Sequence, residues 1–136
     1  MTSSKDQAQN SKELSSSNGS KKYDLEDRTL RFAVNAIEFC KKLPGDRVND
    51  RLVSQLVRSA TSIGANYREA VESVSKKEFS NKAGICRKEA KETSYWLQVV
   101  AKANPSHAET AAALIDESNQ FVKIFATIVR NSLARR

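Results

Sequence analysis

The stretch SKKEFSNKAGICRKEAKETSYWLQVV, residues 75–100, decides the fold of this chain. Apolar and small side chains recur along it at steps of four and three residues, which is the spacing of a complete helix-bundle seam. Ser75 is followed three residues later by Glu78, so the stretch opens with a capping box and predicts a helix that ends near Asn104 and Pro105. The seam consists of Phe79, Ala83, Cys86, Ala90, Thr93, Leu97 and Val100.

The same predicted helix carries a second apolar face. At 100° per residue this face lies about 100° to 160° away from the seam, and Glu92 lies among its apolar members. Trp96 would add on the order of 150 to 250 Å² of contact area if a neighbouring chain covered it. The second face consists of Ile85, Trp96, Val99 and Ala103.

The segment from Asp24 to Leu43 predicts a helix with two adjoining apolar stripes, which together span an arc of roughly 220°. A surface helix of a monomer needs an apolar arc of only about 100° or somewhat more. Because four helices offer no central helix, the pattern predicts a homo-oligomer with Phe32, Phe39 and Trp96 at its subunit interface. The alternative, in which the wide arc reflects deep burial inside the bundle, stays open. One stripe holds Leu30, Ala33, Val34, Ile37 and Cys40, and the other holds Leu25, Phe32, Ala36, Phe39 and Leu43.

Residues 1–22 are predicted to be a disordered tail, because they hold seven serines and a single large aliphatic residue, Leu14. Residues 23–136 are predicted to form one domain of four helices. Connections of about two to six residues force neighbouring helices to lie antiparallel. The predicted fold is therefore an all-α, up-down-up-down antiparallel four-helix bundle.

Caps and breakers set the predicted ends of the other helices. Proline and glycine at residues 44–45 stop the first helix. The second helix begins with a cap between residues 46 and 49 and runs to about Ser73. A second capping box, residues 106–109, opens a fourth helix that runs towards Ser132.

The composition removes several function classes. Of 136 residues 39% are apolar and 29% are charged, and no stretch approaches the roughly 20 apolar residues that a membrane-spanning helix needs. The first residues lack the apolar core of a signal peptide, so we expect a cytoplasmic protein in which Cys40 and Cys86 are reduced core residues. The lone histidine, His107, stands at a helix start, where capping explains it better than catalysis. We therefore predict no enzymatic activity, no metal and no cofactor.

A second stretch carries a resemblance to a known family. The run SQLVRSATSIGANYREA, residues 54–70, resembles the S-Q-L-x-R-x-A-x-S-I-x-x-N-x-x-E pattern of the bacterial four-helix-bundle proteins named after the 23S rRNA intervening sequences. Further matches are YDLE at residues 23–26, KEF at residues 77–79 and KEAKETSYWL at residues 88–97. The chain differs at Gly64, where family members often have proline, so we expect a straighter second helix.

This resemblance implies a homopentameric barrel of four-helix protomers, which agrees with the two-faced helices. It also links the chain to a related branch, the accessory proteins of diversity-generating retroelements, which are basic pentamers that bind a reverse transcriptase and nucleic acid. The chain holds 23 Lys and Arg against 16 Asp and Glu, and its net charge of +7 is compatible with that branch. The resemblance thus suggests RNA or DNA, and a protein such as a reverse transcriptase, as partners.

Polar side chains form one ridge along an edge of the second helix, at spacings of three, four and four residues. With Glu69 they are predicted to fix the register of a subunit interface, because an arginine and an amide can hydrogen-bond a neighbour's carbonyl groups. Arg58, Asn66 and Glu69 are the interface candidates. A ligand-binding pocket and a solvated face remain the alternatives. The ridge consists of Gln55, Arg58, Ser62 and Asn66.

The remaining face of the helix over residues 75–104 is basic and is the candidate nucleic-acid site. Its members fall within about 100° of one another, and Tyr95 can stack on a base. The sequence therefore predicts a nucleic-acid-associated accessory protein. A solvated helix face and a protein-binding scaffold oligomer without nucleic-acid contact are the alternatives. The basic face consists of Arg87, Lys88, Lys91, Tyr95 and Lys102.

Overall fold

The computed structural model describes residues 20–134 of the chain, with side chains from Leu25 to Leu133. Four long helices fill this range, and no strand occurs within it. The predicted all-α class and the four predicted helices are therefore confirmed. The elements are α2 (Ser20–Lys41), α3 (Arg47–Val71), α4 (Lys76–Ala103), the short 3-10 turn η1 (Pro105–His107) and α5 (Ala108–Ala134).

The N-terminal boundary differs from the prediction. Residues 1–19 of the predicted tail lie outside the described residues. Helix α2 begins at Ser20, whereas the sequence predicted a start near Asp24. Lysines at positions 21 and 22 are good helix formers and no glycine or proline separates them from Asp24, so the helix extends through them.

Two side-chain caps start α3 and α4. Asp46 Oδ1 accepts a hydrogen bond from the backbone N–H of Asn49 at 2.7 Å, and the Ser75 hydroxyl accepts one from the N–H of Glu78 at 3.0 Å. The Glu78 carboxylate in turn accepts from the N–H of Val74 at 3.4 Å, one residue before the cap. Each bond satisfies an N–H group that a helix start leaves unpaired, so both helices begin where the sequence predicted.

The start of α5 is built differently from the predicted capping box at residues 106–109. Pro105–His107 form η1, in which the backbone N–H of His107 donates to the carbonyl oxygen of Asn104 at 2.9 Å. Ser106 therefore lies inside the turn instead of capping α5. The fixed φ of Pro105 favours a tight turn at this point. Helix α5 then runs to Ala134, slightly beyond the predicted end.

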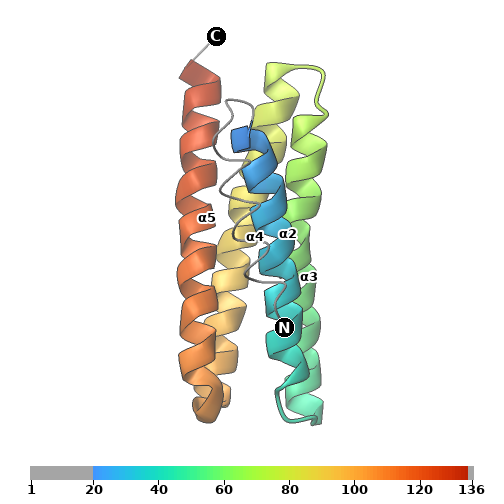
Figure 1. Cartoon of the computed structure of the whole chain (residues 1–136), viewed down its shortest axis with the longest axis vertical. Helices are drawn as coiled ribbons and strands as arrows, with labels where there is room; N and C mark the ends of the chain where they lie inside the picture. Colours follow the sequence, from blue (N-terminus) through green and yellow to red (C-terminus); the bar gives the residue numbers. More distant parts are fainter. Residues whose placement is uncertain (1–19, 135–136) are drawn as a thin grey trace.

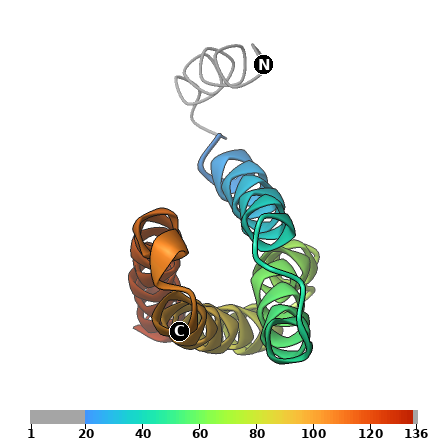
Figure 2. The same cartoon turned by 90° about the horizontal axis from the view of Figure 1, so that it is seen from below.

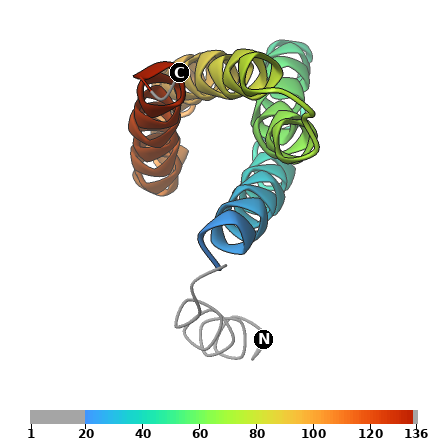
Figure 3. The same cartoon turned by 90° about the horizontal axis from the view of Figure 1, so that it is seen from above.

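Helix α4 occupies the centre of the arrangement. It packs extensively along both α3 and α5, while α2 packs mainly on α3 and has a smaller contact with α5. Figure 1 shows the helices running along the long axis of the molecule, with the connecting turns at alternating ends. In the end views of Figures 2 and 3, α5, α4 and α3 follow one another around an arc, and α2 extends from α3. The seam of α4 therefore serves two neighbouring helices.

The predicted seam of α4 lies in the core. All of its members except the first, the half-buried Phe79, are fully buried. Helix α5 adds Phe121 and Phe125, whose rings are also fully buried and lie 6.3 Å apart. The buried seam residues, each 0% exposed, are Ala83, Cys86, Ala90, Thr93, Leu97 and Val100.

Helix α2 turns the stripe with its phenylalanines towards the core. Phe32 and Phe39 are 2% and 4% exposed, and the Phe32 ring packs edge-on against Phe121 at a centroid distance of 5.4 Å. Leu30 and Val34 of the other stripe are 49% and 46% exposed. The prediction that Phe32 and Phe39 lie at a subunit interface is therefore corrected. Few backbone positions of α2 and α5 come close together, so large aromatic rings fill the space between these helices.

Arg28 gives α2 a second attachment to α5. Its Nε and Nη2 donate to the two carboxylate oxygens of Glu117 at 2.7 and 2.8 Å. Its guanidinium carbon also lies 5.2 Å from the centroid of the Phe121 ring. A two-pronged bond to a carboxylate fixes orientation as well as distance, so Arg28 orients α2 on α5.

Helices α2 and α3 are in close contact at Gly64. A Cβ at this position would lie 2.9 Å from Oγ1 and 3.2 Å from Cβ of Thr29. Thr29 is fully buried, and its hydroxyl donates to the carbonyl oxygen of Leu25 at 2.8 Å. Helix α3 continues through Gly64 without interruption, so the glycine serves the approach of α2 and not a bend.

A reciprocal amide pair joins the first turn of α3 to the end of α4. Nδ2 of each amide donates to Oδ1 of the other, between Asn49 and Asn104, at 3.0 Å in both directions. Nδ2 of Asn49 also donates to the carbonyl oxygen of Pro44 at 2.9 Å, and Nδ2 of Asn104 donates to that of Val100 at 3.0 Å. Both side chains are buried, and their hydrogen bonds fix two connections at the same end of the bundle.

Candidate nucleic-acid interface

The five residues of the predicted basic face are all exposed on α4. They extend along the helix for about 22 Å at 1.5 Å per residue. The buried seam holds the other side of α4 against α3 and α5, so core packing fixes the direction in which this face points. The exposed residues are Arg87, Lys88, Lys91, Tyr95 and Lys102.

The four cations of this face have no ion-pair partner among the described residues. Some other cations are paired, such as Lys82 of the same helix, which binds Glu69 at 2.7 Å. That bond raises the pKa of Lys82. Cations without an intramolecular carboxylate remain available to phosphate groups.

Tyr95 stands near the middle of the basic face and is 57% exposed. Its ring contacts that of Trp96 with the centroids 5.1 Å apart and an angle of 69° between the ring planes. Edge-to-face contact of this kind is a preferred geometry for aromatic pairs. Trp96 is half-buried and packs against the core, so Tyr95 rests on a side chain that is itself held in place.

Trp96 is held in turn by a charged network between α3 and α4. The indole Nε1 donates to Oε2 of Glu92 at 3.3 Å, and Arg58 Nη2 donates to the same oxygen at 2.7 Å. Arg58 Nη2 also donates to Oε1 of the buried Glu89 at 3.1 Å. One arginine on α3 therefore joins two carboxylates and, through Glu92, the indole.

The network shifts the protonation of its members. The hydrogen bond from Arg58 lowers the pKa of the Glu92 carboxyl below its ordinary value of 4.5, with a smaller contribution from the indole of Trp96. The same hydrogen bond to Glu92 raises the pKa of Arg58. Glu92 is therefore ionised and paired at neutral pH, and Arg58, which it shares with Glu89, offsets part of its negative charge beside the basic face.

The structure brings together some of the predicted interface residues and separates others. Arg58 and Glu69 form ion pairs across the α3–α4 junction, and Trp96 reaches this junction through its hydrogen bond to Glu92 of its own helix. Asn66 lies between Arg58 and Glu69 on α3 and donates from Nδ2 to its own helix, to the carbonyl oxygen of Ser62 at 2.9 Å. The buried phenylalanines of α2 do not belong to this group.

Sequence reasoning missed the network around Arg58. In the structure Glu89 and Glu92 of α4 bind Arg58 of α3, and Glu69 of α3 binds Lys82 of α4. The available signal was the position of Arg58 on the polar ridge. That signal could not identify the partner helix, because helical spacing relates only residues within one helix.

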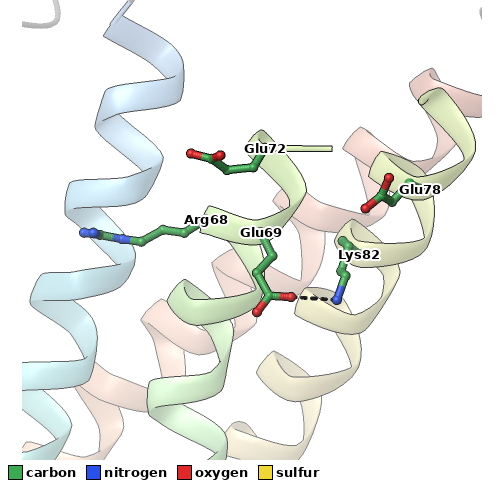
Figure 4. A pocket seen from close by; sticks show the side chains of 5 residues that line it. All are labelled: Arg68, Glu69, Glu72, Glu78 and Lys82. Atoms are coloured by element: carbon green, nitrogen blue, oxygen red, sulfur yellow. Dashed lines mark hydrogen bonds and ion pairs between the residues drawn. The ribbon is translucent and has the colours of Figure 1, made fainter. Parts of the chain in front are cut away.

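A shallow depression lies between the end of α3 and the start of α4, and Figure 4 shows the five side chains that line it. Glu69 and Lys82 point towards one another, while Arg68 extends towards α2 and Glu72 points away from α4. The fifth lining residue is Glu78. The charged groups do not converge on one point, so the depression offers no arrangement for binding a single small ligand.

No group of three or more His, Cys, Asp or Glu side chains among the described residues could hold a metal ion. Both cysteines are free and buried, and burial raises the pKa of Cys40 to about 11 and that of Cys86 to about 12. His107 packs against Phe39 with the ring centroids 6.5 Å apart. A thiol that keeps its proton is a poor nucleophile, so neither cysteine is prepared for covalent chemistry.

None of the described helices is both long and apolar enough to span a membrane.

Comparisons with known proteins identify the family of the chain. The sequence model of the 23S rRNA-intervening sequence protein family matches residues 21–127, and the chain belongs to this family. A solved structure of a protein with unknown function, from the S23 ribosomal protein family of Bacteroides thetaiotaomicron VPI-5482, is 34% identical in sequence. That match has a TM-score of 0.70 and covers 81% of this chain and 98% of the other. No curated protein matches the chain.

Proposed function

We propose that this member of the 23S rRNA-intervening sequence protein family is a non-enzymatic nucleic-acid-associated accessory protein. In this proposal its up-down-up-down bundle assembles into a cyclic homo-oligomer, and the basic face of α4 contacts RNA or DNA through phosphates. The family resemblance supplies the number five for the oligomer and suggests a protein such as a reverse transcriptase as a further partner.

One observation carries the nucleic-acid part of the proposal. Four cations and a tyrosine stand exposed along one helix, and none of the cations is paired with a carboxylate in the described part of the chain. Each cation that contacts a phosphate releases condensed counterions, which gives binding its free energy and its salt dependence. A cyclic assembly would repeat the face on every protomer and so multiply the contacts.

The α3–α4 junction supports the oligomeric part. Trp96 and Val99 are only half-buried within the protomer, and Ile85 is 36% exposed. These apolar side chains lie on the face of α4 next to Arg58 of α3, which is 48% exposed although it forms two ion pairs. A neighbouring protomer that covered this junction would remove apolar area from water and leave the charges already paired.

A salt titration tests the proposal. Binding of the wild-type protein to labelled RNA and DNA should weaken as salt rises, with a logarithmic slope of about 0.9 per neutralised phosphate on duplex DNA. Replacing Arg87, Lys88 and Lys91 together by glutamine should reduce that slope and weaken every sequence alike. The three side chains lie outside the core, so helix content and assembly state should survive and serve as controls. Absence of binding at low salt would remove the nucleic-acid function.

A protein-binding scaffold without nucleic-acid contact is the second candidate, and two exposed apolar residues of α2 favour it. Leu30 and Val34 lie one helical turn apart, and about half of each side chain faces solvent. A helix or a loop of another protein could pack against two neighbouring exposed apolar side chains of this kind. Complex formation that is insensitive to salt and is lost in a Leu30→Glu variant would support this alternative.

A further inference from the structure

We infer that Tyr95 makes the basic face selective for single-stranded RNA or DNA over a duplex. The inference rests on the proposed nucleic-acid function and names its substrate class. It follows from the exposure of Tyr95, from the contacts that hold its ring, and from the cations placed before and after it along α4.

The Tyr95 ring has an open face. Its contact with Trp96 is close to perpendicular, at 69° between the planes, so Trp96 meets either the edge of the tyrosine ring or one of its two faces. In both cases at least one face stays clear of Trp96, and Tyr95 is 57% exposed. An unpaired base can stack on such a face, whereas the bases of a duplex are already stacked on one another.

The ring is also held before any ligand arrives. Trp96 supports it, Glu92 accepts the indole N–H at 3.3 Å, and Arg58 binds Glu92 at 2.7 Å. Residues of two helices therefore hold Trp96, the side chain against which the exposed Tyr95 ring packs. A preordered ring loses less conformational entropy when a base stacks on it than a freely rotating side chain would.

The cations are arranged around Tyr95 as a single strand requires. Lys91 lies four residues before it, which is about 6 Å along the helix axis, and Lys88 and Lys102 lie seven residues to either side, about 10 Å away. A nucleotide stacked on Tyr95 would thus have cations available for the phosphates on both sides of it. Arg58 pairs with Glu92 and offsets part of the negative charge that would otherwise repel those phosphates.

Equilibrium binding to matched probes tests the inference. The probes are a fluorescein-labelled oligouridylate, an oligothymidylate of the same length, and a blunt duplex with the same number of nucleotides per strand. Wild-type protein should bind both single strands more tightly than the duplex at one fixed salt concentration. Tyr95→Ala should weaken single-strand binding by roughly 5- to 150-fold, the equivalent of one lost stack, and should change duplex binding little.

Two further substitutions separate stacking from other roles of the side chain. Tyr95→Phe keeps the aromatic face and should bind single strands like the wild type. Tyr95→Leu keeps apolar bulk without a π face and should resemble Tyr95→Ala. If Tyr95→Leu binds like the wild type, or if Tyr95→Ala weakens single strands and duplex equally, the selectivity does not come from stacking and the inference is overturned.

Trp96 supplies an independent readout, because it is the only tryptophan in the chain. Stacking of a base on the neighbouring Tyr95 should change Trp96 emission when oligouridylate is added, and the duplex should change it much less. The outcomes also distinguish this inference from the broader proposal. Protein that binds neither kind of nucleic acid contradicts the proposed function, whereas protein that binds both equally in a lysine-dependent manner contradicts only the selectivity.

Discussion

Gly64 and Thr29 set how closely α2 and α3 approach, because a Cβ on Gly64 would stand 2.9 Å from the threonine hydroxyl. That hydroxyl has little freedom to move aside. It donates to the carbonyl oxygens of Leu25 and Glu26 at 2.8 and 3.0 Å, and the side chain is fully buried. The contact thus places a glycine inside a helix, where an alanine would otherwise be favoured by about 1 kcal/mol.

Gly64→Ala is expected to destabilise the protein in spite of the better helix propensity of alanine. The added methyl group overpacks the α2–α3 contact, which costs typically about 1 to 3 kcal/mol and exceeds the gain in propensity. Thr29→Ala in the same chain removes the nearer of the two obstructing atoms, Oγ1, and should restore part of the loss, because Cβ of residue 29 remains. Denaturant unfolding of the two single variants and the double variant measures both effects, and a more stable Gly64→Ala protein would contradict this account.

Loss of the reciprocal amide pair should cost about 1 to 3 kcal/mol of unfolding free energy. Asn49→Ala leaves the buried amide of Asn104 without its side-chain partner, and Asn104→Ala does the same to Asn49. The double variant should lose less than the sum of the two single variants, since the partners are in direct contact. Asn81→Ala, an exposed change on α4, is the matched control and should stay within about 0.5 kcal/mol of the wild type. Strict additivity at positions 49 and 104 would count against the pair.

The Arg58–Glu92 pair predicts a specific loss of stability in acid. Its hydrogen bond lowers the pKa of Glu92 in the folded protein below the ordinary value of 4.5, so the unfolded chain binds this proton more readily. The stabilisation is therefore present above about pH 4.5 and is lost as the pH falls through the lower folded pKa. Glu92→Gln should flatten the acid side of the stability curve.

The matched control for that measurement is Glu72→Gln. Glu72 is exposed and forms no ion pair among the described residues. Its replacement should leave the acid dependence unchanged. Equal acid profiles for Glu92→Gln and the wild type would show that the pair contributes no measurable linkage.

Assembly should depend on the apolar face of α4. The proposed cyclic oligomer predicts that Trp96→Glu and Ile85→Glu lower the molar mass in solution, because an unpaired carboxylate buried at a contact costs several kcal/mol. Ile85 is the cleaner test, since it is 36% exposed within the protomer and contributes less to the core. Light scattering coupled to size exclusion gives the mass, and circular dichroism verifies the helix content.

Val74→Glu is the control for this experiment, because Val74 is 93% exposed in the connection between α3 and α4 and lies off the apolar face. It should assemble like the wild type. A 15.1 kDa monomer in the wild-type sample at micromolar concentration would refute the oligomer itself.

Local sequence signals predicted the helices of this protein well. The seam of α4 and the cap at Ser75 follow from spacings of a few residues, and the structure has them where the sequence placed them. The cap of α3 was predicted only to lie between residues 46 and 49, and the structure places it at Asp46. The choice between the two stripes of α2 could not be made in this way, because both are apolar. The choice depends on two contacts with residues far away in the sequence. The Phe32 ring packs against Phe121 of α5, and Thr29 packs against Gly64 of α3.

The candidate site, too, could be predicted from the sequence only in part. Helical spacing alone grouped the five residues of the basic face, and all five are exposed on α4. The support for Tyr95 was not predictable, since it runs through Glu92 to Arg58, which is 34 residues earlier in the sequence and on another helix. Core packing decides which residues of two neighbouring helices face one another. The residue spacing within either helix does not contain this information.

The buried cysteines make this chain convenient for site-specific chemistry. Cys40 and Cys86 are the only cysteines in the sequence, and with pKa values of about 11 and about 12 both keep their protons at neutral pH. Thiolates, and not protonated thiols, are the nucleophiles that react with maleimide and iodoacetamide reagents, so both native cysteines should stay unmodified. A cysteine introduced at the exposed Gln98, beside Tyr95 on α4, would then be the one reactive thiol, and a dye or cross-linker could be attached there without replacing either native residue.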